Sequence, residues 1–235
     1  MRGHILFIAT IFLYGSIAYA QYDRQDRDYS KPFEVVEYPV HRLSADSVCK
    51  IVNDTMSDFY GDIIIESSRD IAYRYRGVWY ECSDISDDFR SGSDYDVTYS
   101  TADIDLDGTS ELLIKFTLRQ YGSGGGTTNF YATIYKFDTV ARKIFDADIG
   151  GADEMFGREY NNGAYYYLVC QQDLIFKKGQ FVVLPASDKD SFHGGMRIKR
   201  EKCDNTVPPG EYKFINGELT LISKRKQTIK RRTKK

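Results

Sequence analysis

Apolar residues recur at the spacing of an α-helix in one stretch of the chain, directly after Ser44. Serine is favoured at helix N-termini, because its side chain accepts a hydrogen bond from a free backbone N–H group. The pattern predicts one helix that begins after Ser44 and ends at Gly61, since glycine is common just past a helix C-terminus. The helical positions are Ala45, Val48, Ile51, Val52, Thr55, Met56 and Phe59.

The rest of the chain is patterned as β-strands, in runs rich in aromatic and β-branched residues. The pairs Asn162-Gly163, Lys178-Gly179 and Asn216-Gly217 are turn signals between these runs. The 19 tyrosines fit sheets with one packed and one wet face, because tyrosine has an apolar body and a polar tip. The predicted strands are Ile63–Ile65, Ile71–Tyr80, Tyr95–Ile104, Glu111–Leu118, Asn129–Phe137, Tyr165–Cys170, Leu174–Phe176, Phe181–Leu184 and Lys213–Ile222.

Two predicted hairpins, Leu174–Leu184 and Tyr212–Ile222, align with each other without gaps. Ile134–Phe137 and Lys143–Phe145 resemble a third copy, with Asp138–Arg142 as a longer turn. Repeated hairpins predict a mainly β fold with one N-terminal helix, in a small β-propeller-like or related β architecture. The alternative is that amphipathic hairpins look alike without being copies of one another.

The N-terminus has the pattern of a secretory signal peptide, residues 1–20. A short basic start precedes the apolar run Ile5–Ile17 and the small-x-small cleavage site Ala18-Tyr19-Ala20. The run is shorter than the roughly 20 apolar residues of a membrane span, so an uncleaved anchor is the less favoured alternative. We expect the mature protein to begin near Gln21 and to be exported, either periplasmic or secreted.

Four cysteines follow the signal, and an even number in an exported chain favours two disulfides. Three connectivities are open, and of these we predict Cys49–Cys82 together with Cys170–Cys203. Each bond would close a loop of about 34 residues and stabilise the fold by roughly 3–4 kcal/mol through loop entropy. Four cysteines could also bind zinc, but the chain has no paired C-x-x-C motif to support that alternative.

Charge and composition divide the mature chain into three parts. Residues 21–40 form a polar, extended lead-in with Pro32 and Pro39, and residues 41–223 are long enough for one domain. Residues 224–235 hold eight Lys or Arg and no acidic residue. We predict a solvated, disordered tail, the alternative being an arm for an anionic surface. Residues 3–223 hold 23 basic and 34 acidic residues, a charge of −11 that disfavours nucleic acid as a partner.

The segment from Asp103 to Glu111 has the most specific chemistry in the chain. Carboxylates at every second position, followed by glycine, form an oxygen-rich loop, and such close charges repel unless a cation neutralises them. Oxygen ligands suit Ca²⁺, whereas Mg²⁺ rarely uses an all-protein cage. A metal-free Asp-rich turn is the alternative. The predicted ligands are Asp103, Asp105, Asp107, Thr109 through its carbonyl, and Glu111.

The loop departs from an EF-hand, which needs a bidentate Glu at the position of Ile114 and helices where this chain predicts strands. On a β-hairpin it resembles the calcium loops of integrin-type (FG-GAP) β-propellers and related exported bacterial proteins, over about Tyr95 to Phe145. Together with the signal, the cysteines, the glycine cluster Gly122–Gly126 and the segment Tyr131–Phe137, it also resembles bacterial periplasmic immunity proteins. That resemblance implies an inhibitor that inserts a loop into the cleft of a peptidoglycan hydrolase.

Catalytic motifs are scarce in the mature chain. Only His41 and His193 remain after cleavage, and Gly122–Gly126 lacks the Lys-Ser/Thr pair of a phosphate-binding loop. We therefore expect a non-enzymatic protein that binds another protein, and the resemblance implies a cell-wall hydrolase as that partner. One alternative is a cell-wall glycan hydrolase that uses a carboxylate pair. The other is a structural protein that docks on a surface through its basic tail.

Overall fold

The protein is described by a computed structural model over residues 32–66, 68–86, 96–122, 125–155, 166–189, 191–193, 196–197 and 202–224. The predicted signal peptide, residues 21–31 of the lead-in, the turn Asn162-Gly163 and residues 225–235 of the tail lie outside these ranges. In the described ranges, no helix has the length and apolar character needed to cross a membrane.

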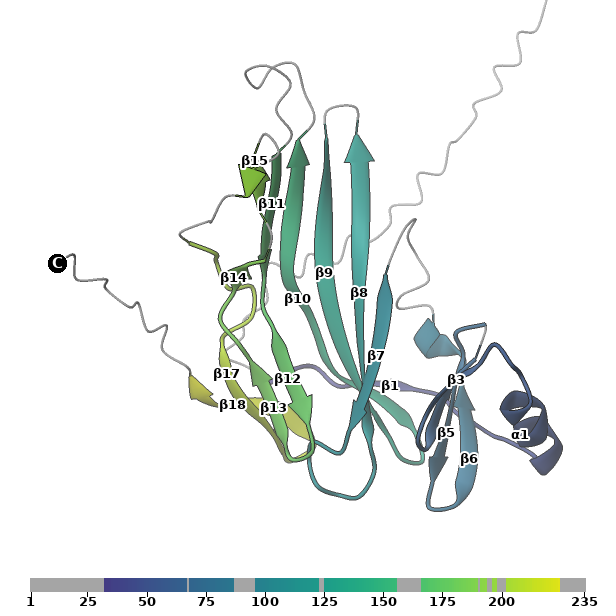
Figure 1. Cartoon of the computed structure of the whole chain (residues 1–235). Helices are drawn as coiled ribbons and strands as arrows, with labels where there is room; N and C mark the ends of the chain where they lie inside the picture. Colours follow the sequence, from purple (N-terminus) through teal and green to yellow (C-terminus); the bar gives the residue numbers. More distant parts are fainter. Residues whose placement is uncertain are drawn as a thin grey trace, which may run out of the picture.

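The described chain is mainly β, with a single α-helix near its start, as the residue pattern predicts (Figure 1). All strand pairs are antiparallel, and most join neighbours in the sequence as hairpins. The elements in chain order are β1 (Val36–Tyr38), β2 (His41–Arg42), α1 (Ala45–Val52), β3 (Asp58–Tyr60), β4 (Ile63–Ile65), β5 (Ile71–Tyr75), β6 (Val78–Cys82), the 3-10 helix η2 (Asp84–Ser86), β7 (Val97–Ala102), β8 (Glu111–Gly122), β9 (Gly125–Phe137), β10 (Ala141–Met155), β11 (Tyr166–Gln171), β12 (Leu174–Lys177), β13 (Gln180–Val183), β14 (Ser187–Asp188), β15 (Phe192–His193), β16 (Met196–Arg197), β17 (Gly210–Ile215) and β18 (Glu218–Lys224).

The strands form three sheets of different size. The large sheet has nine strands in the order β16-β15-β11-β10-β9-β8-β7, with β1 paired to β10 and β14 paired to β11. A four-stranded sheet has the order β12-β13-β17-β18, and a five-stranded sheet has the order β2-β6-β5-β4-β3. A propeller consists of four-stranded blades repeated around an axis. The three sheets of the described residues therefore match the related β architecture of the prediction rather than a ring of blades.

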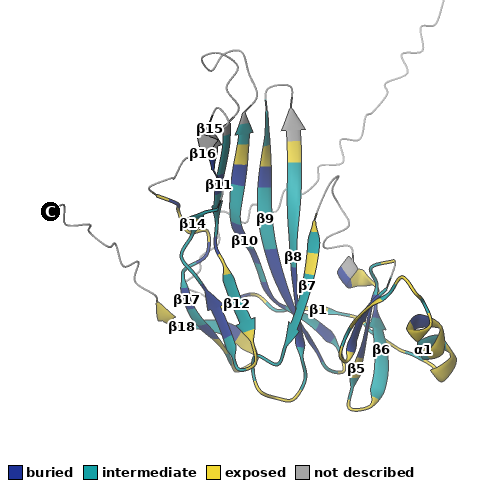
Figure 2. Cartoon of the chain, in the orientation of Figure 1, coloured by how far each residue is buried: buried dark blue, intermediate teal, exposed yellow. Residues whose placement is uncertain are grey.

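The large sheet is the middle of three layers, because the two small sheets cover its opposite faces (Figures 1 and 2). Successive side chains of a strand point to opposite faces. Leu113 accordingly packs toward the four-stranded sheet, whereas Leu112 and Ile114 pack toward the five-stranded sheet. This burial on both faces explains why the run Leu112–Ile114 is apolar without alternation.

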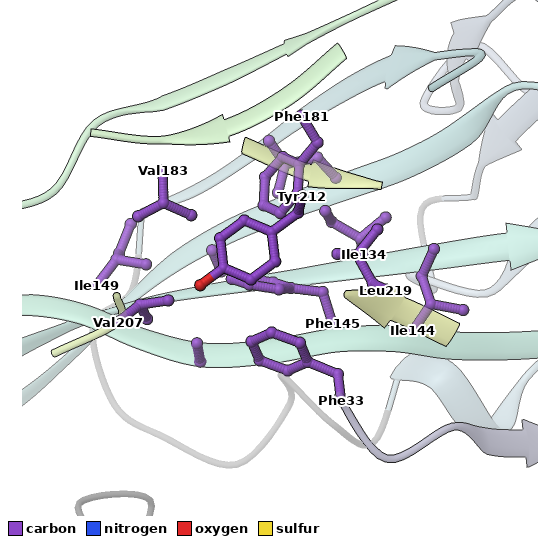
Figure 3. Packing of buried hydrophobic residues seen from close by; sticks show 13 residues of the cluster. Phe33, Ile134, Ile144, Phe145, Ile149, Phe181, Val183, Val207, Tyr212 and Leu219 are labelled. Carbon is purple, nitrogen blue, oxygen red and sulfur yellow. The ribbon is translucent and has the colours of Figure 1, made fainter. Parts of the chain in front are cut away.

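Phe145 lies at the centre of the core between the large and the four-stranded sheet (Figure 3). Its ring centroid lies 4.5 Å from that of Phe33 and 5.0 Å from that of Phe181. Burial of one such ring stabilises a fold by roughly 1.5–3 kcal/mol. Phe33, which is 3% exposed, anchors the end of the lead-in in this core.

The predicted disulfide Cys170–Cys203 is present and ties β11 to the segment before β17. Next to it, the side chain of Gln172 is buried and fully hydrogen-bonded. Its Nε2 donates to the carbonyls of Leu184 and Val207, and its Oε1 accepts from the Val207 N–H group at 2.8 Å. Because an unpaired buried amide is costly, these bonds fix the segment around Val207 against the large sheet.

The second predicted disulfide, Cys49–Cys82, does not form, and both thiols are free. The reason is the alternation of side chains in the five-stranded sheet. Ile64 and Ala72 point toward Ile51 of helix α1, on one face of the sheet. Cys82 lies on the opposite face, buried against the large sheet, whereas Cys49 is exposed on the helix. The sheet therefore separates the two sulfur atoms.

Helix α1 is shorter than predicted, although its start is confirmed. The Ser44 side chain accepts a hydrogen bond from the Ser47 N–H group at 3.1 Å. The helix ends at Val52, and Asp54 then accepts hydrogen bonds from Met56 and Ser57, which gives the backbone an alternative to the helix. Phe59 consequently lies in β3, and Gly61 lies in the β3–β4 turn with a φ of 69°.

Two predicted strands are hairpins. Arg76 and Gly77, with φ values of 49° and 79°, turn the chain within Ile71–Tyr80. Gly77 is the turn signal in this run, and Arg76 adds none because arginine is not a usual turn residue. The predicted turn at Asn216-Gly217 is confirmed, and it divides Lys213–Ile222 between β17 and β18. The aligned hairpins β12–β13 and β17–β18 lie side by side, joined by pairing of β13 with β17.

We expect the two free thiols to react at very different rates with iodoacetamide. Cys49 is exposed, whereas Cys82 is 0% exposed and burial raises the pKa of its thiol to about 11. Only the thiolate is nucleophilic, so Cys82 should alkylate only after the protein unfolds. Mass spectrometry of labelled peptides with and without urea measures this difference. Equal labelling of both thiols in the folded protein would contradict it.

Candidate metal centre

The predicted calcium loop connects β7 and β8 at one end of the large sheet. It is also fixed to the β12–β13 hairpin of the four-stranded sheet, because the Gly179 N–H group donates to the Asp103 carbonyl at 2.8 Å. Leu106 has a φ of 65°, and its side chain lies against Gly179. A Cβ atom at position 179 would lie 3.3 Å from the Leu106 side chain, so glycine leaves room for this contact. The loop therefore lies at the junction of two sheets.

The turn within this loop follows from short-range hydrogen bonds of its carboxylates. Asp105 accepts from the Asp107 N–H group at 3.2 Å, and Asp107 accepts from the Thr109 N–H group at 2.8 Å. Asp103 accepts from the Gly108 N–H group at 3.2 Å. Gly108 has a φ of 91°, which side chains strongly disfavour, so glycine suits this position.

Three of the predicted ligands converge into one acidic cluster. One carboxylate oxygen from each of Asp103, Asp105 and Glu111 lies within 4.8 Å of the others. Glu111 is 1% exposed, and its Oε2 accepts from the Ile104 N–H group at 2.8 Å. Asp103 Oδ1 is buried and accepts no hydrogen bond from the described residues. Oxygen donors in this number suit a hard cation, so the cluster can hold a metal ion.

The other two predicted ligands lie in the same loop but outside this cluster of three. Asp107 directs its carboxylate to the Thr109 N–H group and to a lysine, and its side chain is 42% exposed. Thr109 contacts Asp107 through both its N–H group and its side-chain hydroxyl, and its carbonyl has no hydrogen-bond partner among the described residues. The ligand roles of these two residues remain predictions.

Lys136 of β9 is the residue of this site that the sequence pattern did not reveal. Its ammonium Nζ lies 2.5 Å from Asp105 Oδ2, 2.5 Å from Asp107 Oδ2 and 3.4 Å from Glu111 Oε1. Its side chain is 11% exposed. One signal was available: Lys136 stands inside the apolar strand Ile134–Phe137, and a buried lysine requires a charged partner.

The charges of the site shift one another's pKa in opposite directions. Burial raises the pKa of Glu111 to about 7, against the opposing effects of the Ile104 N–H group and Lys136. Burial also acts to raise the pKa of Asp107, but the hydrogen bonds from Lys136 and Thr109 outweigh it and lower that pKa. For Lys136, burial favours the neutral amine, yet the carboxylates outweigh burial and raise its pKa. The ammonium therefore stays charged at neutral pH.

A second group of carboxylates surrounds Glu66, between β4 and β5. Burial, followed by the neighbouring charges of Glu81, Asp70 and Asp54, raises the pKa of Glu66 to about 7. Its Oε1 is buried and has no hydrogen-bond partner among the described residues. The sequence gives no sign of this group, because its members lie on different strands and turns.

The histidines and the glycine cluster considered for function in the sequence add no further site among the described residues. His41 is exposed in β2, and the side chain of His193 in β15 lies outside the description. Ser191, beside it in sequence, is buried and donates to Asp188 at 2.7 Å while it accepts from the Val169 N–H group. These bonds give Ser191 a structural role. Two residues of the glycine cluster, 123 and 124, also lie outside the description.

Comparison of the chain with protein-family models, curated proteins and solved structures finds no match. The resemblance to integrin-type calcium loops and to periplasmic immunity proteins therefore stays a prediction that rests on the loop motif and its surroundings.

We expect Glu66 to make stability depend on pH. Its pKa rises from the usual 4.5 in the unfolded chain to about 7 in the fold, so the folded protein binds the proton more tightly. The contribution of Glu66 to stability is then greatest below about pH 4.5 and is lost as the pH rises through about 7. Glu66→Gln should reduce this decline and make the protein more stable than wild type at pH 8.

Urea unfolding between pH 4.5 and pH 8, in the presence of EDTA, measures this effect. Glu218→Gln, at an exposed position of β18, is the control and should leave the pH profile unchanged. A Glu66→Gln profile that is parallel to that of wild type would show that Glu66 does not titrate in this window.

Proposed function

We propose that the protein is an exported binding protein whose β7–β8 loop is stabilised by Ca²⁺. The observation that carries this proposal is the convergence of Asp103, Asp105 and Glu111 at the junction of two sheets. A cation there would neutralise charges that the fold itself brings together. It would also fix the loop that contacts the β12–β13 hairpin through Gly179.

The donor set favours Ca²⁺ over other metals. All the side chains of the cluster offer oxygen, and no histidine or cysteine belongs to it. Ca²⁺ takes six to eight oxygen ligands in flexible geometry, so Asp107, the Thr109 carbonyl and water can complete its shell. The buried Asp103 Oδ1, which has no hydrogen-bond partner among the described residues, fits a role as a ligand. Extracellular Ca²⁺ is abundant enough to keep weak structural sites filled.

The partner surface in this proposal is the part of the large sheet that extends beyond both small sheets (Figures 1 and 2). Only one end of β8, β9 and β10 is sandwiched, and their other ends project. Phe116 of β8 packs against the edge of the core shared with the five-stranded sheet, and its ring stacks on that of Tyr131 of β9 with centroids 5.1 Å apart. Both side chains are only partly buried. Aromatic side chains held rigidly by a sheet are common anchors in protein interfaces.

We expect Ca²⁺ to raise the melting temperature, because it binds the folded loop and not the unfolded chain. At 100 times its Kd the ion stabilises by about 2.7 kcal/mol, which corresponds to roughly 5–10 °C for a chain of this size. Asp105→Ala should abolish the response. Asp96→Ala, which removes an exposed carboxylate at the start of the same hairpin, should retain it. A melting temperature indifferent to both Ca²⁺ and EDTA would exclude a calcium site.

We expect the protein to bind a peptidoglycan hydrolase and inhibit it stoichiometrically. Titration of lysozyme-type enzymes against cell-wall substrate measures this, with Tyr131→Ala as the interface variant and Tyr75→Ala, on the five-stranded sheet, as the control. Tyr131→Ala should lose inhibition by tenfold or more, on the order of an interface anchor's contribution. Absence of any complex with such enzymes would reject this partner class and leave the calcium site unaffected.

A further inference from the structure

The ammonium group of Lys136 lies where a cation would neutralise the carboxylates of the β7–β8 loop. It contacts Asp105 and Asp107 at 2.5 Å and approaches Glu111 at 3.4 Å. Two of these three partners, Asp105 and Glu111, also belong to the cluster that can hold a metal ion. The lysine and the ion therefore share ligands.

The shared carboxylates of Asp105 and Glu111 cannot serve both cations in the same arrangement. A Ca²⁺ ion bound to Asp105 Oδ2, the oxygen that Lys136 contacts, would lie about 2.3–2.6 Å from that oxygen. The ion would then be within about 5 Å of Lys136 Nζ, in a site where Glu111 is 1% exposed and water screens little of the repulsion. Binding of the ion requires the ammonium to withdraw.

The ion and the ammonium each have a contact that the other does not use. Asp103 belongs to the cluster but makes no described contact with Lys136, and its Oδ1 is buried with no hydrogen-bond partner in the described ranges. Lys136 Nζ also lies 5.3 Å from the ring centroid of Phe214, on the four-stranded sheet. An aromatic face attracts an ammonium at this distance, so the lysine keeps a favourable contact when it leaves the carboxylates.

We propose that Lys136 is a tethered competitor of the bound cation and sets the affinity of the loop for Ca²⁺. This inference rests on the calcium site of the proposed function. In the absence of Ca²⁺ the ammonium neutralises Asp105 and Asp107, which keeps the loop folded. When Ca²⁺ binds, it takes over these carboxylates and releases the lysine. The affinity of the loop for Ca²⁺ is thereby lowered.

The test measures Ca²⁺ affinity of the full exported chain by isothermal titration calorimetry. Lys136→Met removes the charge and keeps the length of the side chain, so it should tighten Ca²⁺ binding by about tenfold or more. Lys143→Met is the matched control. Lys143 is also a poorly exposed lysine of the large sheet, and its partner Asp146 at 3.6 Å lies outside the loop, so its removal should leave the affinity unchanged.

Each outcome of this titration decides something different. If Lys136→Met binds Ca²⁺ more tightly than wild type and Lys143→Met does not, competition is supported. If Lys136→Met binds Ca²⁺ as wild type does or more weakly, competition is overturned, whereas binding by wild type still supports the calcium site. Binding by Lys136→Met but not by wild type supports competition and contradicts calcium binding as the function. If neither chain binds Ca²⁺, both proposals fail.

Two further measurements cover a variant that folds poorly. Lys136→Met should be destabilised in EDTA and restored by excess Ca²⁺, as urea unfolding shows; a variant that stays unfolded in both conditions overturns the proposal. In the wild-type protein, Ca²⁺ should raise the acetylation of Lys136 by a water-soluble acetylating reagent, measured by peptide mass spectrometry. Unchanged or lower acetylation in a protein that binds Ca²⁺ overturns the proposal as well.

Discussion

The central strands of the large sheet bury both of their faces, and the order of the layers follows from that burial. Strands β8, β9 and β10 carry apolar side chains on their two faces over part of their length, and each face needs a cover. One cover is the four-stranded sheet of the two similar hairpins, and the other is the five-stranded sheet that carries the helix. The order of the layers follows from this need, because apolar area removed from water is the main favourable term in folding.

The acidic loop belongs to this layered arrangement and is not an appendage. Glu111 is the first residue of β8 and is as buried as the core residue Leu112 that follows it. Lys136 enters from β9, next to the core residue Tyr135, and reaches the ring of Phe214 in the four-stranded sheet. A charged network at this depth is costly unless every member is paired. The site therefore couples the electrostatics of the loop to the packing of two sheets.

Much of the fold and part of the site could be predicted from the sequence, because the deciding signals are local. Alternating or continuous apolar runs gave most strands within a few residues, and Asn216-Gly217 marked its turn. The start of the helix at Ser44 follows from its capping chemistry. The spacing of Asp103, Asp105 and Glu111 around Gly108 predicted a cluster, since a tight turn brings such positions together.

The remaining features depend on which face of a sheet a side chain occupies and on which strands lie beside each other. The sequence cannot show that a sheet separates Cys49 from Cys82, whereas Cys170 and Cys203 meet. It likewise cannot show that Lys136, 25 residues after Glu111 in the chain, lies within 3.4 Å of its carboxylate. The sequence alone determined the composition of the acidic loop. The neighbour that neutralises it depends on strand pairing, which joins residues distant in sequence.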